Sequence, residues 1–364
     1  MSAAHVVVTV ADDPGFLDGG FEGWWEALDA GARHDLPTAS TWPREEARAA
    51  LAHPVPWEDM LVLRAVDGVG RVVGAGYVDV PLRENRDTVS AEVVVPAEHR
   101  RRGVGSAMVR AVCDVAEGLG RTRVLGEVAL PLGREPSGWP GCAATRAWGA
   151  RLGLADVRRD MPLPLDAAAA AHLRDLRVEA LPHARGYRWD VVRGALSAQD
   201  AAGTAELASR FWSEAPQGDL DLEDEDVDVE RVQAAGARDV ALGRTCWTAV
   251  ARREDGEVAG WSRLQRSVHE PDVLRQEDTL VLPDHRGHRL GLLLKLATLE
   301  AALADGRAEG WGPEPSLGLR AVRTWNAASN GPMVAVNEAM GFRPVEDLHE
   351  VVADVTALRA AVGR

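Results

Sequence analysis

The chain repeats itself at about half its length. The two most similar segments are 93–109, which reads VVVPAEHRRRGVGSAMV, and 280–299, which reads LVLPDHRGHRLGLLLKLATL. Arg100 of the first recurs as Arg286 of the second, and Gly105 recurs as Gly291, so the offset is a constant 186 residues. A repeat at this distance is far too long for a solenoid and indicates an internal duplication. We therefore expect two domains of similar size within the 364 residues.

In each copy an apolar strand leads through a basic turn into an apolar helix. The backbone N–H groups at the start of such a helix converge with the positive end of its dipole, and this arrangement binds phosphate. In the second copy Gly287 and Gly291 let a ligand approach the backbone, while Arg286, His288 and Arg289 supply positive charge. The pattern predicts a pyrophosphate site; the alternative is an ordinary surface turn.

The charge balance limits the partners. A net charge of −15 argues against nucleic acid or an anionic membrane, since phosphate-rich surfaces select basic proteins, and it favours a neutral or cationic substrate. Three cysteines without a CxxC pair predict neither a disulfide framework nor a metal site. The N-terminal residues lack a signal-peptide pattern, and no apolar run is long enough to span a membrane, so we expect a cytoplasmic protein. A composition rich in Ala, Arg and Gly with little Lys fits a high-GC bacterium.

Hydrophobic periodicity and turn residues predict the same order of elements twice. In the first half we expect strands at 5–10, 60–66, 71–80, 89–95 and 122–128 and helices at 21–30, 43–52, 104–119 and 143–152. In the second half we expect strands at 187–192, 245–251, 258–264, 277–282, 319–325 and 349–355 and helices at 201–212, 229–237, 290–304 and 331–340. This order predicts an α+β fold of two tandem domains, each a mixed, mostly antiparallel sheet flanked by helices. The predicted boundaries are 1–165 and 184–364, with a linker helix in 166–183.

The repeated turns carry a family resemblance. A strand, a Val-x-Pro segment and Arg-x-x-Gly-x-Gly at a helix start resemble the acetyl-coenzyme A signature of the GNAT superfamily of N-acetyltransferases, in the tandem layout of its two-domain actinobacterial members. The second copy differs at Arg289, which stands where the first copy has Gly103. The resemblance implies two GNAT-like domains and acetyl-coenzyme A as the donor substrate. It also implies transfer of the acetyl group to a primary amine of a small acceptor.

The resemblance further implies which residues contact the coenzyme. In the second domain these are Val281, Arg286, Gly287, His288, Arg289, Leu290, Gly291, Asn326 and Asn330. In the first domain they are Val95, Arg100, Arg101, Arg102, Gly103, Val104 and Gly105. The family also has a tyrosine on the following helix, and here Asn337 stands at that position, four residues before Gly341. When Gly153 is taken as the end of the corresponding first helix, that domain lacks both the asparagine and the tyrosine. We therefore expect the second domain to be catalytic and the first to be degenerate.

Two carboxylates precede the second turn, Glu277 and Asp278, and Glu92 corresponds to Asp278 in the first domain. A carboxylate there is suited to accept a proton from the attacking amine, directly or through water. Because side chains alternate along a strand, only one of the two is expected to face the site, and Glu277 is preferred. Asn337 is suited to hydrogen-bond the thiol sulfur without donating a proton. Since neither helix offers a tyrosine, a non-catalytic acyl-coenzyme A-binding or regulatory protein is the alternative to an enzyme.

An acidic run occupies 219–230, DLDLEDEDVDVE, between two predicted helices of the second domain. It is interpreted either as a solvated loop or as a counter-charge for an acceptor that carries more than one amine. The expected partner is thus a small-molecule amine. The sequence is compatible with a monomer or a homodimer.

Overall fold

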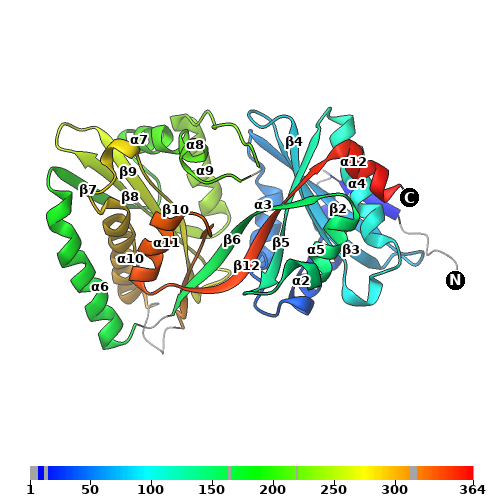
Figure 1. Cartoon of the computed structure of the whole chain (residues 1–364), viewed down its shortest axis with the longest axis horizontal. Helices are drawn as coiled ribbons and strands as arrows, with labels where there is room; N and C mark the ends of the chain where they lie inside the picture. Colours follow the sequence, from blue (N-terminus) through cyan, green and yellow to red (C-terminus); the bar gives the residue numbers. More distant parts are fainter. Residues whose placement is uncertain (1–6, 12–14, 163–164, 219, 311–317, 364) are drawn as a thin grey trace. The chain divides into compact units, whose positions relative to one another are not determined.

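The computed structural model describes residues 7–11, 15–162, 165–218, 220–310 and 318–363. The chain forms two compact units (Figure 1). Unit 1 comprises Met1–Ala155, Gln217–Leu222 and Glu346–Arg364; unit 2 comprises Asp156–Pro216 and Glu223–Val345. None of the helices in these described ranges is long and apolar enough to cross a membrane.

In unit 1 the strand order is β1-β2-β3-β4-β5-β12, and only the β4–β5 pair is parallel. Its strands are β1 (Val7–Ala11), β2 (Glu58–Val66), β3 (Val72–Pro81), β4 (Thr88–Val94), β5 (Arg123–Pro131) and β12 (Arg343–Asp354). Its helices are α1 (Phe16–Gly19), α2 (Phe21–Asp35), α3 (Arg44–Ala52), α4 (Val104–Gly118), α5 (Pro140–Ala147) and α12 (Val355–Val362).

In unit 2 the strand order is β6-β11-β10-β9-β8-β7, and only the β10–β11 pair is parallel. Its strands are β6 (Arg151–Pro162), β7 (Tyr187–Arg193), β8 (Arg244–Arg253), β9 (Val258–Ser267), β10 (Val273–Val281) and β11 (Ala321–Ala327). Its helices are α6 (Ala167–Ala180), α7 (Ala198–Ala208), α8 (Phe211–Glu214), α9 (Val229–Ala241), α10 (Leu290–Glu309) and α11 (Gly331–Met340). The predicted α+β fold, with mixed and mostly antiparallel strand pairing in each domain, is confirmed.

Each half of the chain gives its last strand to the other unit. Most of β6, from Asp156 onward, pairs with β11 in unit 2, while β12 pairs with β5 in unit 1 from Glu346 to Asp354. The compact units therefore differ from the predicted boundaries 1–165 and 184–364. Hydrophobic alternation identifies a strand but not the sheet that accepts it, so the sequence pattern did not contain this exchange. The predicted linker helix is present as α6, with the Asp166 carboxylate accepting a hydrogen bond from the Ala169 N–H at 2.7 Å.

The helix predicted at 143–152 was placed wrongly. It spans Pro140–Ala147 as α5, Gly149 follows in the left-handed conformation (φ 81°), and Arg151 already begins β6. Gly149, not Gly153, therefore corresponds to Gly341, which ends α11 with φ 101°. The unit 1 counterpart of Asn337 is consequently Thr145, so this unit still lacks the tyrosine.

The two parallel strand pairs separate along their length. β10 pairs with β11 only over Val273–Arg275, although it continues to Val281, and β4 pairs with β5 only from Thr88 to Ser90. Beyond these pairs the facing backbone groups lack their ladder partners, which leaves an edge that can bond an extended ligand. In unit 2, α6, α10 and α11 pack on one face of the sheet, and α7 packs on the other. This arrangement places the start of α10 beside the open end of the β10–β11 pair.

Candidate active site

The turns before α4 and α10 have the same backbone conformation, but glycine and arginine have exchanged places at its two left-handed positions. In unit 1 the left-handed positions are Arg101 (φ 60°) and Gly103 (φ 86°); in unit 2 they are Gly287 (φ 82°) and Arg289 (φ 58°). Glycine adopts this conformation without strain, whereas arginine does so at a cost of roughly 1–2 kcal/mol. Each turn therefore contains one glycine and one strained arginine. The two turns share a backbone conformation although the glycine stands at a different position in each.

The start of α10 presents free backbone donors. The first hydrogen bond of the helix runs from the Leu293 N–H to the Arg289 carbonyl at 3.1 Å, so the N–H groups of residues 290–292 precede it. The Leu290 side chain is buried in the core, as is Val104 in unit 1, so these two predicted contact residues offer only their backbone. The helix dipole adds positive potential at this point.

The two turns differ in what lies over their last glycine. A Cβ atom on Gly105 would lie 3.3 Å from the Trp148 ring, while one on Gly291 would have Val281 at 3.9 Å and Thr279 at 4.0 Å as its nearest neighbours. Trp148 thus covers the helix start in unit 1. At the corresponding position of unit 2 no ring of the described residues is among these nearest neighbours, and both of them lie on the separated end of β10.

Arg100 and Arg286 fix their turns to the preceding strand. The Arg100 Nε donates to the Val95 carbonyl at 2.7 Å, and the Arg286 Nε donates to the Val281 carbonyl at 3.1 Å. Their outer nitrogens form ion pairs at 2.6 Å, Arg100 with Asp35 and Arg286 with Glu214. Both predicted coenzyme contacts therefore have structural roles, and Val95 and Val281 use their carbonyl groups to hold these arginines.

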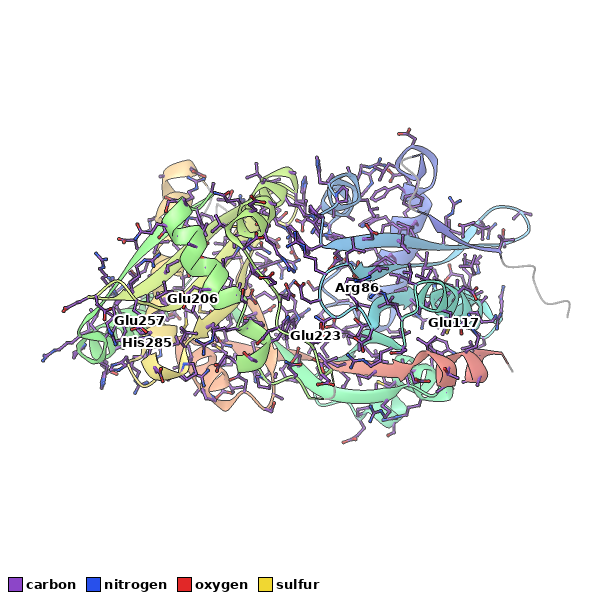
Figure 2. The ribbon with its side chains drawn as sticks, turned by 90° about the horizontal axis from the view of Figure 1, so that it is seen from above. Arg86, Glu117, Glu206, Glu223, Glu257 and His285 are labelled. Carbon is purple, nitrogen blue, oxygen red and sulfur yellow. The ribbon has the colours of Figure 1, made fainter. Side chains whose placement is uncertain are left out.

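The two histidines of the second turn are held by neighbouring residues. His285 is buried, hydrogen-bonds the Tyr187 hydroxyl at 3.0 Å and lies 3.7 Å from Glu257 (Figure 2). The His288 Nδ1 lies 3.0 Å from the His183 carbonyl, and its ring packs on Tyr187. His288, predicted to contact the coenzyme, is thus oriented by unit 2 itself. Arg289 is exposed, as are Arg101 and Arg102 in unit 1.

Arg289 offers a matched test of the two turns. We expect Arg289→Gly to weaken acetyl-coenzyme A binding about 3- to 10-fold, because it removes one charge near the diphosphate while relieving backbone strain. Arg101→Gly makes the same change in the covered turn and should leave the affinity unchanged. Isothermal titration calorimetry measures the affinity of both variants for acetyl-coenzyme A. A larger loss of affinity in Arg101→Gly would contradict the assignment of the donor site to unit 2.

The carboxylates before the turn lie in a β-bulge. The register between β9 and β10 shifts between Gln276, opposite Leu264, and Thr279, opposite Ser262, so Glu277 and Asp278 together face Arg263. Strand alternation therefore fails here, and with it the reason for preferring Glu277. Bulges commonly redirect a side chain beside an active site.

The two carboxylates have different surroundings. Glu277 accepts a hydrogen bond from the Gln265 amide. Asp278 keeps an exposed surface, and within the described part of the chain nothing hydrogen-bonds its carboxylate. Desolvation by nearby protein atoms and then the charge of Glu277 raise the pKa of Asp278 to about 6. A carboxylate that is accessible, unpartnered and titrates near neutral pH has the properties of a general base.

The counterpart in unit 1 is arranged differently. Glu92 lies in regular register opposite Tyr77, without a bulge, and the Tyr77 hydroxyl hydrogen-bonds its carboxylate. Burial raises the pKa of Glu92, and that hydrogen bond opposes the shift. The unit 1 carboxylate is therefore engaged by a neighbouring side chain where Asp278 is free.

A buried polar chain runs behind the separated strands of unit 2. The Lys295 Nζ donates to Asn337 Oδ1 at 2.9 Å, Asn337 Nδ2 donates to Asn326 Oδ1 at 3.0 Å, and Arg159 donates to the same Asn326 oxygen at 3.0 Å. All four side chains are at most 9% exposed. The predicted residues Asn326 and Asn337 thus meet, whereas Asn330 caps α11 by accepting from the Met333 N–H at 3.3 Å.

Lys295 was not among the residues predicted from the sequence. It lies in the apolar helix 290–304, where one polar residue among leucines suggests a solvent-facing position. Its burial instead lowers the pKa to about 7. The sequence did contain one signal that could have identified this residue: Lys295 is the only lysine in the chain.

Because Lys295 is buried, we expect the stability of the folded protein to depend on pH. Between its folded pKa of about 7 and its ordinary value of 10.5, only the unfolded chain binds the proton, so the free energy of unfolding rises with pH in this window. The slope is at most about 1.4 kcal/mol per pH unit. Lys295→Met should remove this rise and stabilise the protein at pH 7. Urea unfolding of the wild-type protein and the variant at pH 7 and 9 measures how much the free energy of unfolding rises. An equal rise in the variant would contradict the burial of an ionisable Lys295.

The described part of the acidic run, 220–230, is partly structural. Asp224 accepts a hydrogen bond from the Ser213 N–H at 2.7 Å, Glu225 pairs with Arg231, and Asp228 caps α9. In unit 1, the Leu220 carbonyl accepts from Arg123 at 2.6 Å. Asp219 lies outside the described residues. Several carboxylates of the run are therefore engaged in folding the loop. Among the described residues no cluster of His, Cys, Asp and Glu could hold a metal ion.

Comparisons with known proteins agree with this geometry. Residues 24–132 match the family model of the Acetyltransferase (GNAT) family. No curated protein matches the chain. The chain is similar to a tandem GNAT protein from the clavulanic acid biosynthesis pathway, solved without AcCoA, with 24% identity, a TM-score of 0.72 and coverage of 96% of this chain and 98% of the other. It is also similar to a GCN5-related N-acetyltransferase from Sphaerobacter thermophilus, with 14% identity, a TM-score of 0.56 and 96% coverage of both chains.

Residues 24–132 therefore match a GNAT acetyltransferase domain, and over nearly its whole length the chain has the fold of a tandem GNAT protein. The family model matches residues 24–132, within the first half of the chain, whereas the turn without a covering ring and the carboxylate of Asp278 lie in unit 2.

Proposed function

We propose that this protein is an acetyl-coenzyme A-dependent N-acetyltransferase whose active site lies in unit 2. The observation that carries the proposal is the start of α10, where Gly291 leaves the backbone donors open beside the separated end of β10. Unit 1 has the same turn under Trp148. Its role in the proposal is to complete the fold rather than to bind the donor.

The residues of unit 2 fit the donor substrate. The N–H groups of residues 290–292 would hold the diphosphate, and Arg289 adds an exposed positive charge. The unpaired edges of β10 beyond Arg275 and of β11 beyond Arg323 offer backbone groups to the extended pantetheine arm. Acetyl-coenzyme A supplies the activated acetyl group as a thioester.

Asp278 is proposed as the general base. A primary amine attacks only when it is neutral, so its proton must be removed before or during the attack. The bulge exposes Asp278 on β10, and a pKa of about 6 leaves the carboxylate deprotonated at neutral pH but still able to accept a proton. Glu277 is engaged by Gln265 and acts mainly by raising the pKa of Asp278.

The acceptor is proposed to be a small molecule with a primary amine. The net charge of −15 favours a cationic acceptor over an anionic one. A dedicated polyamine counter-charge in 220–230 is not required, because Asp224, Glu225 and Asp228 have structural partners.

Release of free thiol from acetyl-coenzyme A tests the proposal. A panel of mono-, di- and polyamines and amino sugars should contain acceptors that accelerate thiol release by wild-type protein. A non-catalytic acyl-coenzyme A-binding protein, which the missing tyrosine supports, would bind the donor without acceleration by any amine. Binding without turnover across the panel would favour that second function.

A further inference from the structure

The chain uses lysine only once. Of its 41 basic Lys and Arg residues, Lys295 is the single lysine. An arginine keeps its proton at any physiological pH, whereas the amine of a buried lysine can give it up. The one basic side chain of this protein that can release a proton near neutral pH, apart from histidine, is therefore inside the candidate active site.

The internal repeat shows that the fold does not need this lysine. The residue at the same position in unit 1, 186 residues earlier, is Val109 on α4, and it is buried. An apolar side chain thus fits this site in the same helix of the same fold. Burying an amine in place of a valine costs stability, so packing does not explain Lys295.

Lys295 connects the helix of the diphosphate turn to the position where the family has its tyrosine. It is four residues after Gly291, one turn further along the same face of α10. Its Nζ donates to Asn337 Oδ1 at 2.9 Å, and Asn337 stands at the position where the family has a tyrosine. An asparagine side chain plus one hydrogen bond spans about the length of a tyrosine side chain. The Lys295 amine therefore lies at a similar distance from the α11 backbone as a tyrosine hydroxyl would.

We propose that Lys295 is the proton donor to the thiolate that leaves in the proposed acetyl transfer, an inference that rests on the proposed function. As the new C–N bond forms, Asp278 takes a proton from the amine nitrogen. The C–S bond breaks, the sulfur keeps the electron pair, and the Lys295 ammonium gives it a proton. Asp278 then releases its proton to water and the neutral lysine amine takes one up from water, so that the net products are the amide and the free thiol. Asn337 is a positioning residue, held in turn by Asn326 and Arg159.

The electrostatic setting supports this role. Burial alone lowers the pKa of Lys295 to about 7, so about half of the molecules carry the ammonium at neutral pH, where proton transfer is most efficient. Among the described residues, the charged group linked to it is Arg159 on β6, which reaches it through the two asparagines. The structure offers no tyrosine for the task, because Tyr187 bonds His285 and Tyr77 lies in unit 1.

Isotope-labelled lysine gives a direct test. With one lysine in the chain, nuclear magnetic resonance shows a single ε-amine, and its pKa can be titrated in the free protein and with coenzyme A or desulfo-coenzyme A. We expect coenzyme A, compared with desulfo-coenzyme A, to raise the pKa of Lys295 by about one unit or more, because a thiolate next to the ammonium favours its charged form. Equal values with both ligands would overturn the inference. If neither ligand binds, the proposed function itself fails.

Kinetics of three variants provide a second test. Lys295→Met and Lys295→Arg should both lower kcat about 10²-fold with little change in KM for acetyl-coenzyme A, since a guanidinium does not release its proton. Val109→Met is the matched control in unit 1 and should keep wild-type rates. Full activity in Lys295→Arg would show that positive charge alone suffices and would rule out proton donation.

Discussion

Asp278→Asn should lower kcat/KM for the amine acceptor by about 10²–10⁴-fold, because the amide cannot accept the amine proton. Wild-type kcat/KM should rise with pH through about 6, as the Asp278 carboxylate loses its proton, and this step should vanish in the variant. The affinity for acetyl-coenzyme A should stay unchanged, since the N–H groups of residues 290–292, and not this carboxylate, are proposed to bind the diphosphate. Steady-state kinetics between pH 5 and 8 measure each of these quantities.

Two matched variants make that result specific. Glu92→Gln changes the equivalent carboxylate of unit 1 and should leave the rate unchanged. Glu277→Gln removes a neighbouring negative charge and should lower the pH of the step while keeping most of the activity. If Glu277→Gln were inactive and Asp278→Asn active, the base would be Glu277, as strand alternation alone suggested.

Gly291→Trp should weaken acetyl-coenzyme A binding by about 10²–10⁴-fold. The new ring would cover the helix start as Trp148 covers Gly105, and two charge-assisted hydrogen bonds to the diphosphate are together worth about 3–6 kcal/mol. Gly291→Ala places only a methyl group, with its nearest neighbours at 3.9 and 4.0 Å, and should have a much smaller effect. Calorimetric titration gives the affinities, and circular dichroism checks that the variants fold.

The control for this result is in unit 1. Gly105→Ala brings a methyl group against the Trp148 ring at 3.3 Å and leaves unit 2 untouched. We expect wild-type affinity for acetyl-coenzyme A in this variant. Wild-type affinity in Gly291→Trp together with lost affinity in Gly105→Ala would move the donor site to unit 1.

Local features of the sequence predicted much of this arrangement. The duplicated turns, the helices that follow them and most of the strands are local patterns of glycine, charge and apolar periodicity, and they are present in the structure. The sequence also predicted that Glu277 and Asp278 precede the turn. It did not predict which of the two is accessible, because the bulge depends on how β10 pairs with β9.

Tertiary packing accounts for what the sequence did not reveal. Which sheet receives β6 or β12 is decided by long-range pairing, and a strand pattern is the same in either sheet. Trp148 covers Gly105 only because α5 ends at Ala147, a boundary that the sequence placed too late. The sequence analysis did not single out Lys295, because its burial depends on how α10 packs, and α10 is buried along most of its length.

Hydrogen exchange with and without acetyl-coenzyme A tests the central claim most directly. If the donor binds at the start of α10, amides of residues 286–292 should become protected on addition of acetyl-coenzyme A, and amides of residues 100–106 should exchange as before. One equivalent of donor per chain in a parallel native mass spectrum would agree with this result. Protection at 100–106 without protection at 286–292 would contradict the assignment of the active site to unit 2.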